Sequence, residues 1–168
     1  MSQRDPVAVS IIGNDRVGIV ATVTKVLFEL GCNLEDVSST ILRGHFAMML
    51  IVRCPDGIGP AEIEAALQPA ASELELVASA RPVAEADLAV KPPTHMISVY
   101  GADRPGIVFK VADALAGTHA NITDLTSRVI GSDEQPVYAV MLEVAVPQDT
   151  DLDATLTRLK DELDVDIS

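Results

Sequence analysis

Residues 10–20 read SIIGNDRVGIV, and 88 positions later residues 98–108 read SVYGADRPGIV. The similarity extends beyond these two stretches. Over the 36 pairs from Ser10/Ser98 to His45/Asp133, 12 are identical, where average composition would give about two. A period of 88 residues is too long for one unit of a solenoid, so we expect each copy to be a small fold with its own core.

The alternation of apolar residues predicts the same element order, βαββαβ, in both copies. Gly31 closes the first helix, and Arg43-Gly44-His45 is typical of a hairpin turn. In the first copy the predicted elements are a strand at 7–13, a helix at 19–30, strands at 34–42 and 46–53, a helix from Pro60 to Leu74 and a strand at 74–80. In the second copy they are a strand at 95–101, a helix at 105–118, strands at 122–130 and 137–146, a helix marked by Leu152, Leu156, Leu159 and Leu163, and a short final strand.

Split βαβ units in this order form an antiparallel sheet with both helices on one face, which is the ferredoxin-like arrangement. The sequence therefore predicts an α+β protein of two tandem domains, at 1–82 and 94–168, joined by a linker at 83–93. The run 46–52 is apolar at every position, although one face of such a sheet carries no helix. We expect the sister domain or a second chain to cover the bare faces or edges, and a homodimer is the expected assembly; the alternative is that a few apolar residues are exposed.

The turn sequences resemble those of ACT domains, small βαββαβ modules that bind an amino acid and regulate another protein. Residues 101–108, GADRPGIV, match the pattern of that family fully, whereas residues 13–20, GNDRVGIV, carry Val17 in place of proline. Asn33 with Asp36 and Asn121 with Asp124 extend the resemblance. Two copies in a chain of this size are similar to the glycine cleavage system transcriptional repressor group.

The chemistry of these turns suits a zwitterion. A helix N-terminus offers unpaired N–H groups and a positive dipole end to a carboxylate, and glycine lets a ligand approach the backbone closely. An aspartate could accept from an ammonium group, and an asparagine both donates and accepts. The residues expected to bind the ligand are Asn14, Asp15, Val17, Gly18, Ile19 and Asn33 in the first copy, and Ala102, Asp103, Pro105, Gly106, Ile107 and Asn121 in the second.

Each of these residue types has an alternative, purely structural role. Asp15 and Asp103 could cap the helices that follow them, and Asn33 and Asn121 could satisfy turn backbone. The arginines of the two turns, at positions 16 and 104, fit solvated side chains or pairs with acids of the partner domain better than ligand contacts.

Charge and composition exclude several functions. The chain has 12 Lys and Arg against 25 Asp and Glu, a formal charge of -13, so we expect no direct binding of nucleic acid and none to a membrane surface. The N-terminal residues lack the pattern of an export signal, which favours a cytoplasmic protein. Cys32 and Cys54 are interpreted as buried apolar thiols.

The sequence contains no convincing catalytic or metal-binding pattern. We therefore expect no catalytic residue, no metal and no cofactor. Residues 151–155, DLDAT, imitate a phosphatase motif, but the leucine stripe places them in a helix and only 13 residues follow Thr155. The sequence thus favours a non-catalytic regulator that binds a small amino acid and signals to a protein partner, an activator or a metabolic enzyme. The alternatives are a ligand-free interaction module and the regulatory subunit of an amino-acid metabolic enzyme.

Overall fold

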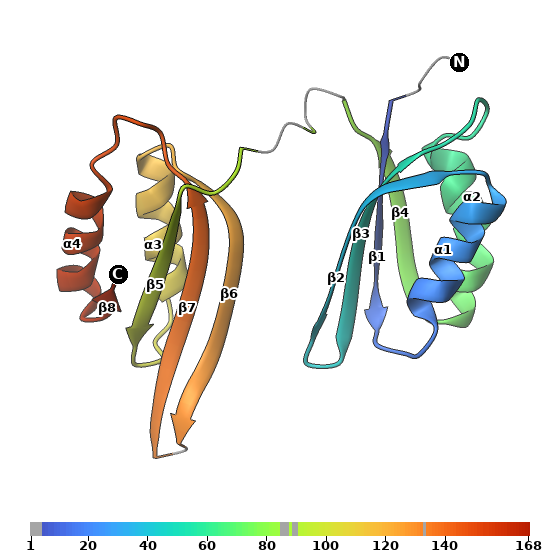
Figure 1. Cartoon of the computed structure of the whole chain (residues 1–168). Helices are drawn as coiled ribbons and strands as arrows, with labels where there is room; N and C mark the ends of the chain where they lie inside the picture. Colours follow the sequence, from blue (N-terminus) through green and yellow to red (C-terminus); the bar gives the residue numbers. More distant parts are fainter. Residues whose placement is uncertain (1–4, 85–87, 89–90, 133) are drawn as a thin grey trace. The chain divides into compact units, whose positions relative to one another are not determined.

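The computed structural model describes residues 5–84, 88, 91–132 and 134–168, which form two compact units, 1–90 and 91–168 (Figure 1). The division between the units falls inside the predicted linker. Residues 85–87, 89 and 90 of that linker lie outside the described residues, and its exact bounds at 83–93 stay a prediction.

The first unit has the predicted order of elements. They are β1 (Val7–Asn14), α1 (Ile19–Glu29), β2 (Asn33–Leu42), β3 (His45–Arg53), α2 (Pro60–Glu73) and β4 (Leu76–Pro82). The four strands form an antiparallel-paired sheet in the order β2-β3-β1-β4, and both helices cover one face of it (Figure 1). Pro60 is the first helical residue of α2, as expected of a residue that lacks an N–H.

The second unit repeats this arrangement. Its elements are β5 (His95–Gly101), α3 (Ile107–Gly117), β6 (Asn121–Ser132), β7 (Gln135–Ala145), α4 (Leu152–Leu163) and β8 (Asp166–Ile167), and its sheet order is β6-β7-β5-β8. The helix predicted from Pro105 begins two residues later, at Ile107, because Pro105 and Gly106 form a turn before it. The ferredoxin-like α+β fold is thereby confirmed in both copies.

Strand β3 explains the run of seven apolar residues. Phe46, Met48, Leu50 and Val52 point toward the helices and are buried, as the two-residue period of a strand requires. The three residues between them face the other side of the sheet, where Met49 is 50% exposed. Each sheet therefore has one face packed on helices and one open face within its own unit.

The β2–β3 hairpin has a two-residue turn in which Arg43 and Gly44 both have positive φ angles, 49° and 82°. This left-handed pair matches the twist of the flanking strands and sets the register of the hairpin. A bulge interrupts the register between Leu34 and Asp36, and an equivalent one lies between Ile122 and Asp124 in the second unit.

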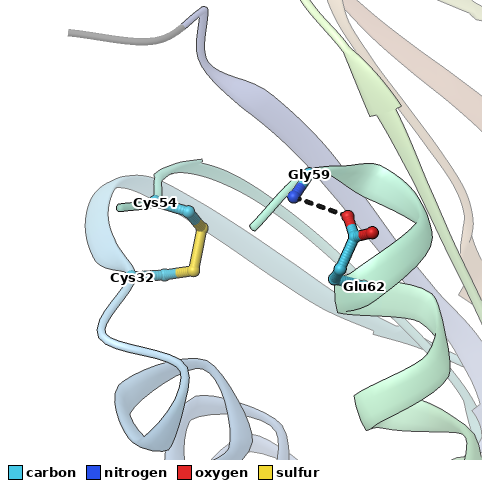
Figure 2. Close-up of a disulfide and its surroundings, with 4 residues drawn as sticks. All are labelled: Cys32, Cys54, Gly59 and Glu62. Atoms are coloured by element: carbon cyan, nitrogen blue, oxygen red, sulfur yellow. Dashed lines mark hydrogen bonds between the residues drawn. A yellow bond between two sulfur atoms is a disulfide. The ribbon is translucent and has the colours of Figure 1, made fainter. Parts of the chain in front are cut away.

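Cys32 and Cys54 form a disulfide, so the interpretation of them as free buried thiols is wrong (Figure 2). Cys32 precedes the first residue of β2, and Cys54 follows the last residue of β3. Asn33 pairs with Arg53 in the sheet, which places the two flanking cysteines side by side with their Cα atoms 4.1 Å apart. Counting outward from the two-residue turn puts Cys54 opposite Asn33, so it is the bulge between Leu34 and Asp36 that brings Cys54 opposite Cys32.

Candidate ligand site at the strand-to-helix turns

The helices that follow β1 and β5 begin without a side-chain cap. Gly18 and Gly106 are the N-cap residues, with left-handed φ angles of 96° and 95°, and no side chain accepts from the first helical N–H groups. The interpretation of Asp15 and Asp103 as helix caps is therefore wrong. Because the first turn of a helix has no carbonyl partners of its own, its N–H groups are left for solvent or a ligand.

The space above these helix ends is open. A Cβ atom built on Gly18 or Gly106 would meet nothing within 4 Å. The side chains of Ile19 and Ile107, by contrast, are buried in the core at 1% and 4% exposure. Ile19 and Ile107 can therefore offer a ligand only their backbone N–H groups. Asp15, Asp103 and Val17 have exposed side chains.

Each turn borders a hollow. The first has a volume of about 540 Å³ and is lined by Asp15, Gly18 and Ile19 together with Ser39 and Thr40 of β2 and Phe46 of β3. The second, of about 420 Å³, is lined by residues 103–109 and by Tyr138 of β7. The residues from β2, β3 and β7 are not among the ligand residues expected from the sequence. The repeat held two signals for them, the identity of Ser39 with Ser127 and the alignment of Phe46 with Tyr138, two aromatic residues.

The two turn arginines anchor the turns within their own domains. Arg16 pairs with Glu75, with 2.8 Å between Nη2 and Oε1. Arg104 Nη2 donates to the carbonyl oxygens of Leu163 and Asp164, at 2.7 and 3.2 Å. Both arginines thus reach the chain where the second helix of their own domain ends, a contact not included in the expectation that they are solvated or pair with acids of the partner domain.

Asn33 and Asn121 do not join the turn residues of their own domain. Asn33 pairs with Arg53 at one end of β3, whereas Asn14, beside the turn, pairs with His45 at the other. Eight residues of strand separate these ends, or about 27 Å. Figure 1 shows the cause, since α1 carries the chain back along the sheet before β2 begins. Each domain therefore holds the turn residues as one group and the asparagine as another.

Comparison with known proteins agrees with this geometry. Models of the ACT domain match residues 5–80 and residues 95–164. The chain belongs to the ACT domain family. Its two ACT domains occur in tandem and are regulatory domains by family.

Relatives and solved structures extend this assignment. A UPF0237 protein of Methanopyrus kandleri is 42% identical over 67 residues, which are 39% of this chain and 74% of that protein. One from Methanocaldococcus jannaschii is 52% identical over 46 residues, 27% of this chain and about half (51%) of its own. An unknown protein from Galdieria sulphuraria superposes with a TM-score of 0.80 at 29% identity, covering 98% of this chain and 96% of its own. A proposed glycine cleavage system transcriptional repressor shares the fold, with a TM-score of 0.65 at 17% identity over 98% of this chain and 95% of its own.

The described ranges contain neither a metal-ligand cluster nor a membrane-spanning helix. There, no three His, Cys, Asp or Glu side chains are grouped so that they could hold a metal ion. None of the helices in the same ranges has both the length and the apolar character needed to cross a bilayer.

Proposed function

We propose that this tandem ACT protein is a non-catalytic regulator that binds a small amino acid at its strand-to-helix turns and signals to a protein partner. The observation that carries the proposal is the pair of uncapped helix ends at Gly18 and Gly106, each open above the backbone and each bordering a hollow. An uncapped helix N-terminus stabilises a carboxylate through its N–H groups and its dipole.

The remaining groups of a small amino acid find partners around each turn. Asp15 or Asp103 would accept from the ammonium group, and the hollow beside it would hold the side chain. In the second domain Pro105 and Phe109 would line an apolar wall. We propose the second turn as the stronger site because it carries the complete family pattern. Asn33 and Asn121 would act there only if supplied by another domain, since each lies at the far end of its own sheet.

Binding becomes regulation if the amino acid favours one arrangement of the protein over another, because equal affinity for both shifts nothing. The arginine contacts offer a physical link for this change. Arg104 joins the second turn to the carbonyl end of α4, so a ligand that moves the turn also disturbs that end.

The proposed output is regulation of transcription or of an amino-acid enzyme through protein contact. The likeness to a proposed glycine cleavage system transcriptional repressor supports the first of these. A net charge of -13 opposes direct contact with DNA phosphates, so we propose an activator protein as the partner. Tight, sequence-specific binding of DNA by the isolated protein in a gel-shift assay would contradict this part of the proposal.

Calorimetric titration of the full chain with each of the twenty amino acids tests the ligand. We expect heat from one or a few small amino acids, and at least a tenfold weaker affinity in Asp103→Ala, because a charged partner of the ammonium group is lost. Asp15→Ala reports on the first turn. Asp113→Ala removes an exposed acid from the middle of α3 and should leave the affinity unchanged. Absence of heat from all twenty would support the ligand-free interaction module.

A further inference from the structure

The open face of the second sheet carries an ordered pattern of charge that the first sheet lacks. Three rows of side chains cross β6, β7 and β5 in turn. The outer rows are Asp124, Glu143 and Met96 on one side and Arg128, Ala139 and Tyr100 on the other, and the middle row is Thr126, Met141 and Ser98. These rows line a shallow hollow of about 390 Å³.

The acidic row is unfavourable in the isolated domain. Asp124 and Glu143 are cross-strand neighbours, and like charges directly opposite each other destabilise a sheet. Among the described residues of the second domain, neither their carboxylates nor the Arg128 guanidinium has a hydrogen-bond or ion-pair partner. Apolar side chains beside them are also exposed, Met96 at 60% and Met141 at 44%. The face therefore has unmatched charge of both signs around an apolar centre.

We propose that this face binds the same face of a second copy of the chain, with the strands of the two sheets antiparallel. Consider a twofold axis that lies between the two faces and runs along the middle row. It places β6 over β6 and exchanges the two outer rows, so Arg128 of each copy lies over Asp124 of the other. The pair therefore contains two Arg128–Asp124 contacts, each between charges that are unmatched in a single copy.

The other contacts of this arrangement are complementary in size and chemistry. Glu143 lies over the small side chain of Ala139, which leaves room for it beside Arg128 of the second copy. Tyr100 lies over Met96, a pairing of sulfur with an aromatic ring that is favourable. Met141 meets its own copy at the centre. Sheets packed face to face are about 10 Å apart, a gap that an arginine and an aspartate reaching from opposite sides can close.

The first sheet cannot form this pattern. The positions equivalent to Arg128 and Glu143 are Thr40 and Ile51, and Ala8 stands at the position of Met96. The proposal is therefore specific to the second domain, and it does not depend on the proposed binding of an amino acid. The patch of three strands covers roughly 400 Å² per copy, half of a standard interface, so we expect weak and concentration-dependent association.

Sedimentation velocity of the full chain, up to about 1 mM, tests the proposal with charge reversals. We expect a monomer–dimer equilibrium in the wild type. Arg128→Glu and Asp124→Arg should each raise the dissociation constant by on the order of tenfold or more, because each puts like charges together at both contacts. Arg158→Glu makes the same change of net charge as Arg128→Glu, on the exposed side of α4, and should leave the equilibrium unaltered.

Recombining the reversals identifies the register. The two single variants, mixed, should form a heterodimer, since every contact then joins opposite charges, and the double variant Arg128→Glu/Asp124→Arg should dimerise again on its own. A wild type that stays monomeric throughout, or a dimer insensitive to Arg128→Glu, would overturn the proposal. So would a failure of the mixture to associate when both single variants fold, as judged by circular dichroism.

Discussion

The two domains have the same fold but hold equivalent parts of it together with different contacts. The disulfide of the first domain joins Cys32 and Cys54, whose counterparts in the second are Ala120 and Val146, an apolar pair packed on the core. An ion pair to Glu75 anchors the first turn, whereas hydrogen bonds to the carbonyl end of α4 anchor the second.

The bulges at the start of β2 and β6 are also stabilised by different contacts in the two domains. In the first domain the bulged residue, Glu35, pairs with Arg53, whereas its counterpart Thr123 donates to the carbonyl of Glu143. The pattern of buried apolar residues is common to both domains, and the polar or covalent contacts are exchangeable. The apolar pattern therefore determines the fold, and the other contacts adjust the stability and the surface of each domain.

Replacing the disulfide with the residues of the second domain should have the largest effect. The bond closes a loop with a sequence separation of 22 residues, so Cys32→Ala/Cys54→Val should lose on the order of 3 kcal/mol of unfolding free energy. Native-state hydrogen exchange should place the loss in residues 5–80 and leave α3 and α4 unchanged.

The same experiment has a chemical control. Alkylation of the denatured, unreduced wild type should label neither cysteine, and reduction should lower the stability of the wild type but not that of the double variant. Labelling of both cysteines without reduction would contradict the bond. Disulfides are uncommon in reducing compartments, so the cytoplasmic location expected from the sequence stays a prediction.

Replacing the glycine near the end of the first strand of each domain with alanine should be the next most damaging change. A Cβ on Gly13 would lie 2.6 Å from Leu76 Cδ2 and 2.9 Å from the backbone oxygen of Glu75, whereas one on Gly101 would meet the side chain of Val165 at 2.6 Å. Backbone yields less than a side chain, so we expect Gly13→Ala to cost about 2 kcal/mol and Gly101→Ala about 1 kcal/mol.

Double-mutant cycles in denaturant distinguish the two clashes. Val165→Ala should relieve most of the cost of Gly101→Ala, because it removes the methyl group that clashes. Leu76→Ala should leave much of the cost of Gly13→Ala, because the oxygen of Glu75 remains. Equal relief in both domains would show that the backbone contact is unimportant.

Exchanging the residues Val17 and Pro105 between the two turns should change the unfolding free energy less, and with opposite signs in the two domains. Val17 is fully exposed, and its N–H takes part in no backbone hydrogen bond of the described residues. Val17→Pro should therefore stabilise the first domain by about 0.4–1 kcal/mol through the unfolded chain, and Pro105→Val should destabilise the second by a similar amount. Chemical denaturation of each variant measures the change, and a loss in Val17→Pro would show that the turns differ in backbone conformation.

An ion pair specific to the second domain should have the smallest effect. Lys110 Nζ lies 2.7 Å from Glu162 Oε1, and this hydrogen bond together with the charge of Lys110 lowers the pKa of Glu162. A lowered carboxyl pKa contributes stability above the unfolded value of 4.5, which is lost as the pH falls through the folded value. Lys110→Met should return the pKa of Glu162 toward its ordinary value in an NMR titration, with little change in stability at pH 7 because both groups are exposed.

The duplication, the element order, the fold class and the turn motif could all be predicted from the amino-acid sequence. These features are local or repeated, since the period of apolar residues and the glycines at turns act within a few positions along the chain. The turn of the β2–β3 hairpin was also predicted from local residues, but its register was not, and the bulge between Leu34 and Asp36 is what brings Cys32 opposite Cys54.

Which residues distant in sequence come into contact could be learned only from the tertiary structure. It separated Asn33 from Asp15, because β1 and β2 run parallel and the end of one strand lies far from the start of the next. It joined Arg16 to Glu75 across 59 positions and aligned Arg128, Asp124 and Glu143 on one open face. Such contacts depend on strand pairing and on the packing of helices over the sheet, and neither of these produces a periodic signal in the sequence.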